Sequence, residues 1–194
     1  MKKRLILASG SPRRRELLRN AGFTFEVIPP EVAEDNPDNE APAMLVERLA
    51  LDKAEAVAGR FHRQDNVVVL GADTVVVVVD STLLGKPASP AEARQMLQRL
   101  SGRTHEVITG VALVEPETAR RTVAHETTRV FFRPLEPQEM EDYVATGEPL
   151  DKAGAYAIQG GASRFVTRVE GCYFNVMGLP VALVDRLLRE CGML

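Results

Sequence analysis

Two valine-rich runs between residues 67 and 79 constrain the fold of this chain more than any other feature of its sequence. They cover residues 67–70 and 75–79 and are separated by Gly71-Ala72-Asp73-Thr74. Short, continuous apolar runs of this kind are typical of strands buried in the core of a sheet. Elsewhere, strand-like and helix-like segments intermix without a regular βαβ alternation. The sequence therefore predicts an α/β or α+β fold with a mixed sheet.

The other expected elements follow from hydrophobic periodicity and from turn and capping residues. Strands are expected at residues 4–8, 23–28, 104–114 and 121–132, with a hairpin formed by residues 164–169 and 172–176. Helices are expected at residues 12–20, 42–58, 89–100 and 137–145, and Pro180 opens a last one. The 194 residues suffice for one domain or for two small lobes around a shared cleft. We expect a single domain over residues 1–194.

The charge balance and the cysteine content limit the partners of the protein. The chain has 24 basic and 27 acidic residues. This balance argues against nucleic acid as a partner, because such binding needs a clustered basic surface, but it does not exclude a small anion. Cys172 and Cys191 match no zinc or disulfide pattern. Because no apolar stretch approaches the about 18 residues of a membrane helix, we expect no membrane partner and a cytoplasmic location.

A cluster of cations opens the helix expected at residues 12–20. Acidic residues are preferred in the first turn of a helix, because the helix N-terminus carries a positive partial charge and unpaired N–H groups. Here Arg13, Arg14 and Arg15 occupy that turn, after Ser9-Gly10-Ser11. A phosphate would neutralise the arginines and accept hydrogen bonds from the turn. Arg13 and Arg14 lie four residues before two leucines and so face the packed side, whereas Arg15 is expected to be solvated.

Two charged residues lie in otherwise apolar surroundings. Asp73 separates the valine-rich runs, where a carboxylate is costly unless it is paired, bound to a metal or catalytic. The simpler alternative is a turn residue, and the pattern alone leaves the two interpretations about even. Ligands often bind at strand ends, which favours function slightly. Lys53 interrupts an apolar stripe of the helix expected at residues 42–58, where a lysine usually extends its ammonium group to solvent.

Two further lysines lie in glycine-containing loops, Lys86 in Gly85-Lys86-Pro87 and Lys152 in Asp151-Lys152-Ala153-Gly154. Glycine lets the backbone approach a ligand closely. Five cations near turns, together with carboxylates at Glu34 and Asp73, suggest a polyphosphate ligand and a divalent metal ion. The five cations are Arg13, Arg14, Lys53, Lys86 and Lys152.

Longer motifs occur in order along the chain. They are LILASGSPRRRELL (5–18), GADTVV (71–76), GKP (85–87), LSGRTHEVITGVAL (100–113), EPLDKAGAYAIQG (148–160) and GLP (178–180). These segments resemble the signature of the Maf family of nucleotide pyrophosphatases, and the resemblance spans essentially the whole chain. It implies an elongated α/β fold of the inosine-triphosphatase type, with a mixed sheet, flanking helices and two lobes around a central cleft. It also implies a homodimer.

The resemblance implies a reaction and assigns roles to residues. Family members hydrolyse a nucleoside triphosphate to the monophosphate and pyrophosphate with a divalent cation, Mg²⁺ or Mn²⁺. Asp73 matches the proton acceptor, and Lys53 and Lys86 match catalytic cations. Asp73 and Glu34 would hold the metal, although the loose alignment of the acidic loop leaves Glu31 as a rival. The other residues that match the phosphate-binding side are Ser9, Arg13, Arg14 and Lys152.

Fewer residues carry the choice of substrate. Arg13, Thr74 and Gln159 resemble the branch that acts on dTTP and UTP, whereas a branch specific for 7-methyl-GTP has glutamate in place of this glutamine. Gln159 has a donor and an acceptor and can pair with the adjacent carbonyl and N–H of a pyrimidine. Ala157 stands where the motif usually has glycine, which we expect to matter only if a positive φ is required. The alternatives are a pyrophosphatase for another base and a nucleotide-binding regulator of septum formation without turnover.

Overall fold

The computed structural model describes residues 3–33, 36, 39–78 and 82–194. These residues form two compact units, each with its own cluster of buried apolar side chains. The prediction of a single domain over residues 1–194 stays a prediction. Unit 1 consists of Met1–Asp73, Thr109–Glu126 and Gly178–Leu194, and unit 2 consists of Thr74–Ile108 and Thr127–Met177.

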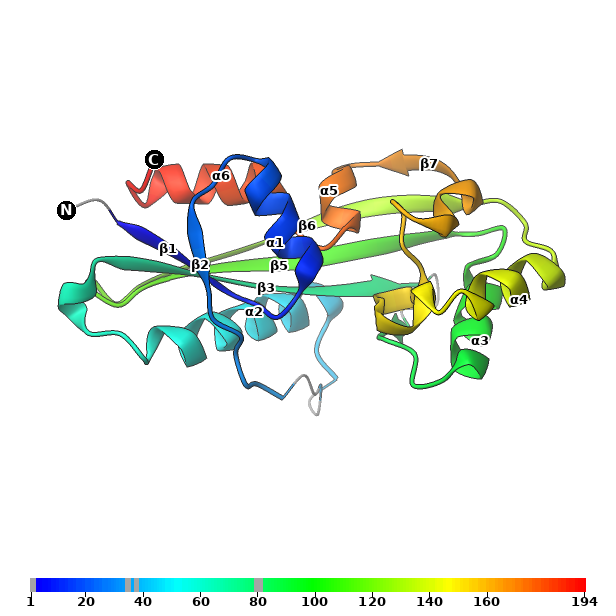
Figure 1. The fold of residues 1–194 in the computed structure, drawn as a ribbon, viewed down its shortest axis with the longest axis horizontal. Helices are drawn as coiled ribbons and strands as arrows, with labels where there is room; N and C mark the ends of the chain where they lie inside the picture. The colour runs from blue at the N-terminus through cyan, green and yellow to red at the C-terminus, as the bar shows by residue number, and fades with distance from the viewer. Residues whose placement is uncertain (1–2, 34–35, 37–38, 79–81) are drawn as a thin grey trace. The chain divides into compact units, whose positions relative to one another are not determined.

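Helices and strands intermix along the chain as the sequence predicts (Figure 1). The strands are β1 (Arg4–Ala8), β2 (Phe25–Val27), β3 (Val67–Val77), β4 (Leu83–Leu84), β5 (Thr104–Glu115), β6 (Arg120–Phe132) and β7 (Val166–Glu170). The α-helices are α1 (Pro12–Asn20), α2 (Pro42–Ala58), α3 (Pro90–Leu100), α4 (Pro137–Ala145), α5 (Tyr173–Val176) and α6 (Val181–Glu190). Short 3₁₀ helices lie at η1 (Arg63–Asp65), η2 (Glu148–Asp151), η3 (Ala153–Ala155) and η4 (Gly161–Phe165).

The strands form a mixed sheet, which confirms the predicted α/β class. Their order is β2-β1-β3-β5-β6-β7, and β4 pairs with β3 off this path. Strand β1 runs parallel to both β2 and β3, whereas β4 is antiparallel to β3 and β7 is antiparallel to β6. A parallel pair needs a crossover connection, and α1 and α2 provide the two connections around β1.

The central prediction about the valine-rich segment is wrong in one respect. The two runs and the residues between them form a single strand, β3, which covers Val67–Val77. The proposed turn at Gly71-Ala72-Asp73-Thr74 is therefore strand, and Gly71 pairs with Ala8 of β1. Every residue of β3 except Thr74 is buried. Asp73 is thus a carboxylate inside a buried strand, and its interpretation as a turn residue is wrong.

Glycine at two positions lets α2 pack directly against the sheet of unit 1. A Cβ on Gly71 would lie 2.1 Å from the carbonyl oxygen of Ala50, and one on Gly110 would lie 2.1 Å from that of Val46. No side chain fits in either place, because real Cβ atoms do not approach backbone oxygens so closely. The helix backbone therefore lies against β3 and β5, which fixes the height of the α2 side chains above the sheet.

The apolar residues of unit 1 divide between the two faces of its strands. Helix α2 lies on one face, and α1 and α6 lie on the other (Figure 1). On β1, Ile6 and Ala8 join the cluster around α2, and the alternating residues Leu5 and Leu7 point the opposite way. The predicted C-terminal helix is α6, and it buries Leu183, Leu187 and Leu188.

Unit 2 has an aromatic core beneath α3 and α4. Phe132 packs edge-on against Tyr156 at 5.0 Å between ring centroids, and Tyr143 packs edge-on against Phe165 at 5.3 Å. Nε2 of His105 lies 2.8 Å from the hydroxyl of Tyr156. Burial lowers the pKa of His105 to about 3, so this ring is neutral at physiological pH.

The hairpin expected at residues 164–176 is also wrong in its second half. Strand β7 pairs with β6, but residues 173–176 form the short helix α5. The buried side chain of Asn175 donates to the carbonyl of Val107 at 2.9 Å, and the Thr128 hydroxyl accepts from the N–H of Cys172 at 3.0 Å. These long-range contacts outweigh the local strand preference of residues 173–176.

No helix among the described residues is both long and apolar enough to cross a membrane.

Because the backbone of α2 lies so close to Gly71, adding a single methyl group there should strongly lower the stability of the protein. Gly71→Ala should lower the free energy of unfolding by about 2–3 kcal/mol, because the backbones of β3 and α2 must move apart. Urea unfolding followed by circular dichroism measures the change.

Gly59→Ala is the matched control for this substitution. Gly59 has a φ of −60° at the end of α2, and a Cβ there would have its nearest neighbour at 3.5 Å. We expect Gly59→Ala to leave stability unchanged or to raise it slightly. Equal stability of both variants would contradict the packing assigned to Gly71.

Candidate active site

The centre of the site in unit 1 is a buried ion pair. Nζ of Lys53 lies 2.6 Å from Oδ1 of Asp73, and the two side chains are 8% and 9% exposed. Lys53 reaches this position because it belongs to the buried stripe of α2, which packs on β3 without intervening side chains. The expectation that Lys53 extends to solvent is wrong. Two opposite charges held out of water at hydrogen-bond distance are a common feature of catalytic sites.

The arginine cluster lies at the N-terminus of α1, which follows β1. Strand β1 is the neighbour of β3, the strand that carries Asp73. Strands β1 and β3 are parallel, and Ala8, the last residue of β1, pairs with Gly71. Ser9 therefore leaves the sheet at the same edge at which Asp73 lies, two residues beyond Gly71. In open α/β sheets, ligands bind at the carboxyl ends of parallel strands. Ser9 is buried, and its hydroxyl accepts a hydrogen bond from the N–H of Ser11 at 3.1 Å.

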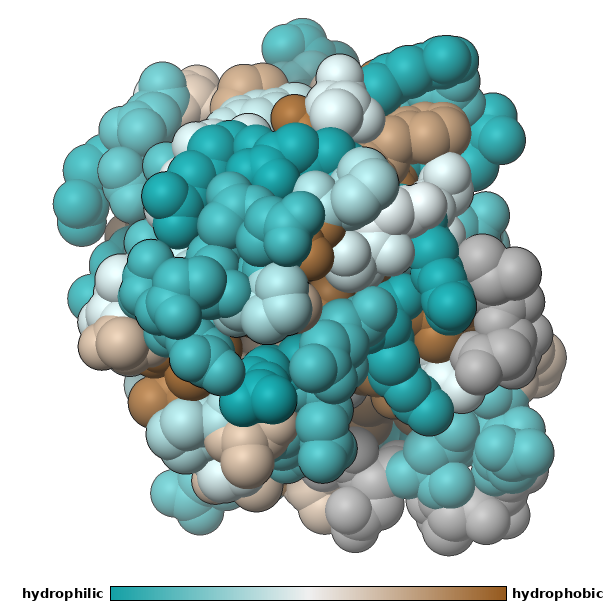
Figure 2. Space-filling model, turned by 90° about the vertical axis from the view of Figure 1, so that its right-hand side faces the viewer, coloured by the Kyte–Doolittle hydropathy of each residue, from teal (hydrophilic) through white to brown (hydrophobic). Residues whose placement is uncertain are grey.

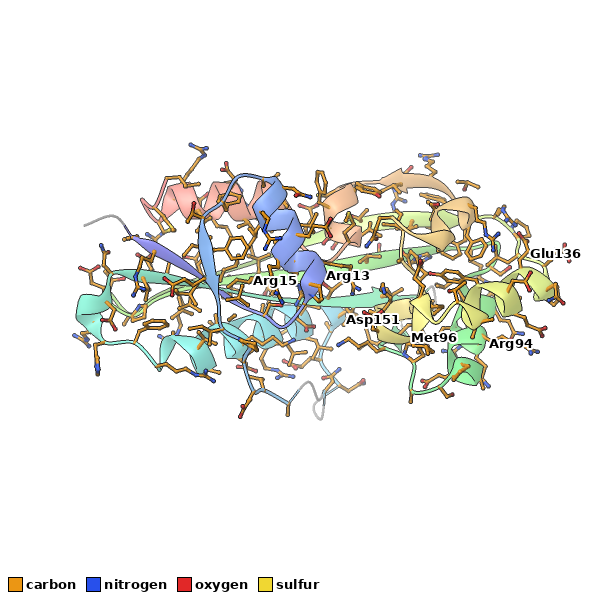
Figure 3. The ribbon with its side chains drawn as sticks, viewed as in Figure 1. Arg13, Arg15, Arg94, Met96, Glu136 and Asp151 are labelled. Carbon is orange, nitrogen blue, oxygen red and sulfur yellow. The ribbon has the colours of Figure 1, made fainter. Side chains whose placement is uncertain are left out.

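The first turn of α1 is capped and carries the predicted arginines. The hydroxyl of Ser11 accepts from the N–H of Arg14 at 3.4 Å, and no acidic residue lies in this turn. Nε of Arg14 donates to the carbonyl of Gly178 at 2.8 Å, which ties α1 to the GLP motif. Figure 3 shows Arg13 and Arg15 at this end of the helix. Arg15 is half-buried with a fully covered Nε, so the expectation that it is simply solvated is wrong.

The carboxylates available to a metal ion are few. Glu34 lies outside the described residues, and Glu31 is exposed. Among the described residues, no three His, Cys, Asp or Glu side chains form a cluster that could hold a metal ion. Mg²⁺ bound to a nucleotide typically uses one or two carboxylates and the phosphate oxygens. The carboxylate of Asp73 fits a cation that is bound largely by phosphate oxygens of the substrate.

Unit 2 brings together the two segments that carry Lys86 and Lys152. The N–H of Gly154 donates to the carbonyl of Gly85 at 3.0 Å. Gly154 has a φ of +70°, and a Cβ there would lie 2.9 Å from the side chain of Val76, so this position requires glycine. Lys86 is exposed. The ammonium group of Lys152 donates to the carbonyl of Glu148 at 3.0 Å and pairs with the carboxylate of Asp151.

Gln159 lies in the same segment of unit 2, with an exposed side chain. It occupies a tight turn in which the N–H of Gly160 donates to the carbonyl of Ala157 at 3.0 Å. The positive φ values of this segment fall on Gly154, at 70°, and Ala155, at 57°, and not on Ala157. The replacement of the usual glycine by Ala157 therefore causes no backbone strain, as expected. Thr74 is half-buried and follows Asp73 directly in β3.

Two residues that support the Lys152 and Gln159 segment do not stand out in the sequence. The carboxylate of Glu148 accepts from the hydroxyl of Tyr143 at 2.7 Å and from the N–H of Gly161. Glu148 belongs to the EPLDKAGAYAIQG motif but carries no local signal of a special role. In unit 1, Gly178 of the GLP motif also carries no local signal of its role, which is to accept a hydrogen bond from Arg14 through its backbone carbonyl.

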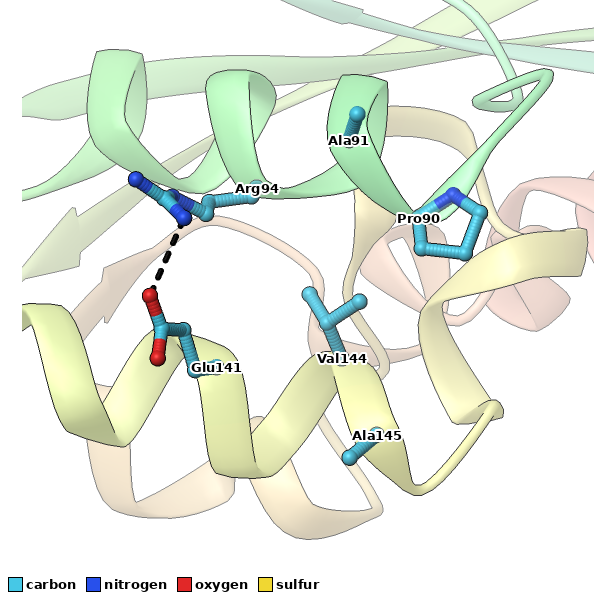
Figure 4. A pocket seen from close by; sticks show the side chains of 6 residues that line it. All are labelled: Pro90, Ala91, Arg94, Glu141, Val144 and Ala145. Atoms are coloured by element: carbon cyan, nitrogen blue, oxygen red, sulfur yellow. Dashed lines mark hydrogen bonds and ion pairs between the residues drawn. The ribbon is translucent and has the colours of Figure 1, made fainter.

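A groove of about 340 Å³ lies between α3 and α4 of unit 2. An ion pair between Arg94 and Glu141 spans it at 3.0 Å (Figure 4). The face of the molecule drawn in Figure 2 is mainly hydrophilic, with apolar residues in small, separate spots. None of the predicted site residues contributes to the groove, so it is distinct from the candidate site. Its lining consists of Pro90, Ala91, Arg94, Glu141, Val144 and Ala145.

The fold is shared with solved structures of Ham1 proteins. The structure of the Staphylococcus aureus Ham1 protein matches with a TM-score of 0.56 and 16% identity, covering 97% of this chain and 99% of that chain. A HAM1 protein from Coxiella burnetii matches with a TM-score of 0.54 and 18% identity over the same shares. At these identities the likeness shows the fold alone, and it defines the structural class of the protein.

Sequence comparison shows the family to which this chain belongs. The family model described as Maf-like protein matches residues 4–191, so this chain belongs to that family. Curated relatives of similar length are named dTTP/UTP pyrophosphatase. The one from Symbiobacterium thermophilum is 54% identical over 97% of this chain and 94% of its own length. The one from Pelotomaculum thermopropionicum is 50% identical over 98% and 97%, respectively.

The buried ion pair predicts non-additive effects on stability. Asp73→Asn should lower the free energy of unfolding by about 3–5 kcal/mol, because it leaves the ammonium group of Lys53 buried without a counter-charge. Lys53→Met should cost a similar amount for the opposite reason. The double variant, Lys53→Met with Asp73→Asn, should recover most of this loss. Urea unfolding of the four proteins measures the coupling.

Glu141→Gln provides the control, because it breaks a pair with Arg94 whose side chains are about half exposed, at 49% and 48%. We expect it to change stability by less than about 1 kcal/mol. If the losses caused by the Lys53 and Asp73 substitutions simply add, the two side chains do not form the buried pair.

Proposed function

We propose that this protein hydrolyses dTTP and UTP to the corresponding monophosphate and pyrophosphate. The observation that carries the proposal is the buried pair, 2.6 Å apart, of Asp73 in the GADTVV motif and Lys53 in α2. The names of the relatives from Symbiobacterium thermophilum and Pelotomaculum thermopropionicum support the same substrates. Modified pyrimidine nucleotides belong to the same substrate class.

Asp73 is the proton acceptor in this reaction. Lys53 donates to Oδ1 and holds the carboxylate in one orientation. We assign Oδ2 to the attacking water, whose proton it accepts as the water oxygen bonds to the α-phosphorus. The bond from the α-phosphorus to the oxygen that bridges to the β-phosphate breaks, and pyrophosphate leaves with the bonding electrons.

The cations bind the phosphates and neutralise the charge of the leaving group. Arg13 and Arg14 provide guanidinium groups at the N-terminus of α1, where the helix dipole also favours an anion, and Ser9 adds a hydroxyl. The family resemblance assigns Lys86 and Lys152 to the phosphates as well. Lys152 exchanges its present contacts with Asp151 and the Glu148 carbonyl for phosphate oxygens.

A divalent cation, Mg²⁺ or Mn²⁺, belongs to this proposal. Asp73 and Glu34 are the carboxylates that would hold it, together with phosphate oxygens, and Glu31 is the alternative to Glu34. A bound cation supplies Lewis-acid stabilisation of the phosphate charges. The homodimer implied by the family resemblance and the cytoplasmic location stay predictions.

Gln159 and Thr74 select the base and the orientation of the nucleotide. The exposed amide of Gln159 offers both a donor and an acceptor, which matches the adjacent carbonyl and N–H of thymine or uracil. Two alternatives are tested against this proposal. One is a pyrophosphatase that prefers another base, such as 7-methylguanine, and the other is a protein that binds nucleotides without hydrolysing them.

Product analysis with a nucleotide panel tests the reaction. With Mg²⁺ present, the protein should release pyrophosphate and a pyrimidine monophosphate from dTTP and UTP. Asp73→Asn should lower kcat by at least about 100-fold, because the proton acceptor is lost, while nucleotide affinity is largely kept. The double variant with Lys53→Met controls for folding and should be equally inactive. Another monophosphate, no product, or a fully active Asp73→Asn protein would each refute the proposal or this assignment.

Substitution of Gln159 tests the choice of base. Gln159→Glu removes the amide donor, so the ratio of kcat/KM for dTTP to that for dCTP should fall about tenfold or more. Gln98→Glu makes the same change at an exposed position of α3 and should leave the ratio unchanged. An unaltered ratio in Gln159→Glu would remove this residue from base selection.

A further inference from the structure

The turn that carries Gln159 is held at both of its ends by side chains from outside the turn. Before Gln159, the N–H of Ala157 donates to the hydroxyl of Tyr143 at 3.0 Å. After it, the N–H of Gly161 donates to the carboxylate oxygens of Glu148 at 3.1 and 3.2 Å. The exposed side chain of Gln159 is thus presented from the middle of a short turn with two fixed ends.

The two side chains that hold the turn are bonded to each other. The hydroxyl of Tyr143 donates to Oε1 of Glu148 at 2.7 Å. Tyr143 itself is 1% exposed, and its ring packs edge-on against Phe165. Burial and the neighbouring carboxylate of Glu148 raise the pKa of Tyr143, so the hydroxyl keeps its proton and donates it. The pair is therefore a rigid bracket that rests on the core of unit 2.

The sequence of the turn is adapted to this bracket. A Cβ on Gly160 would lie 2.4 Å from both carboxylate oxygens of Glu148, so only glycine lets the turn approach the carboxylate. The backbone carbonyl of Glu148 also accepts from the ammonium group of Lys152 at 3.0 Å. A single residue thus contacts both the turn of Gln159 and the side chain of Lys152.

We propose that Tyr143 and Glu148 are positioning residues for base selection, which act by fixing the turn of Gln159. This inference rests on the proposed function, because it adds residues to the same site. An exposed amide discriminates between bases only if its backbone is held in place, since a mobile amide can adjust its donor and acceptor to either partner. The bracket supplies that restraint through two backbone N–H groups.

A double-mutant cycle between Tyr143 and Gln159 tests the proposal. Tyr143→Phe removes the hydroxyl that bonds Ala157 and Glu148 but keeps the ring. The ratio of kcat/KM for dTTP to that for dCTP should fall about five- to tenfold, the size expected for one or two lost hydrogen bonds. In a Gln159→Ala background the same substitution should leave the ratio unchanged, because the group on which it acts is absent.

Two further variants separate positioning from a general loss of stability. Tyr156→Phe also deletes a buried hydroxyl in unit 2, one that bonds His105 and not the turn. It should leave the ratio unaltered. Glu148→Gln keeps the shape but replaces one acceptor oxygen by an amide donor, so it should lower the ratio in the same direction as Tyr143→Phe.

Amide hydrogen exchange of the wild-type and variant proteins measures how firmly the turn of Gln159 is held, and it does not depend on enzymatic activity. The amides of Ala157 and Gly161 should exchange at least about tenfold faster in Tyr143→Phe than in the wild type, and should be unchanged in Tyr156→Phe. Unchanged exchange, an unchanged ratio in Tyr143→Phe, or additive effects with Gln159→Ala would each overturn the proposal. A wild-type protein without a preference for dTTP and UTP over other nucleotides would instead overturn the proposed function, and the exchange rates would still show whether the bracket holds the turn.

Discussion

The contact of Lys53 with Asp73 is the interaction on which the rest of the candidate site depends. Two charges in an apolar layer are stable only as a pair, so the ammonium group must reach the carboxylate at hydrogen-bond distance. That requirement sets the distance between α2 and β3, which is met only because Gly71 has no side chain toward the helix. The distance between α2 and β3 therefore determines both the packing of the sheet and the position of Lys53 relative to the proposed proton acceptor, Asp73. A change in one alters the other.

The parallel pairing of β1 with β3 extends this constraint to the proposed phosphate-binding residues of unit 1. Because Ala8 pairs with Gly71, the chain leaves β1 at Ser9 beside the strand that carries Asp73. The short connection into α1 then places an N-terminus rich in arginine at the same edge, where its charge is unfavourable without an anion. The contact from Arg14 to the carbonyl of Gly178 shows why the GLP motif accompanies the arginine motif, although the two lie far apart in the sequence.

In unit 2, the side chains assigned to the site are polar and lie near the surface, so contacts of their backbone must hold them in place. Lys86, Lys152 and Gln159 lie on segments with little regular structure, so their backbone must be restrained by other contacts. The bond from Gly154 to Gly85 joins the two lysine segments, and the pair of Tyr143 and Glu148 holds the turn of Gln159. The glycines at 154 and 160 belong to this scheme, since a side chain at either position would collide with its neighbour.

The sequence by itself determined the helices with a capping serine, α1 and α3, and the long strands β5 and β6, because these signals are local. Motif similarity also identified the residues of the candidate site. The sequence could not show that Gly71-Ala72-Asp73-Thr74 continues a strand, because a glycine two residues before an aspartate is also typical of a turn. The neighbouring strand and helix decide between the two. Nor could the sequence show that residues 173–176 form a helix, since the contacts of Asn175 come from β5 and β6. Only the tertiary structure decided which partner each buried polar group has. That choice depends on contacts between residues far apart in the chain, and local sequence carries no information about their distance.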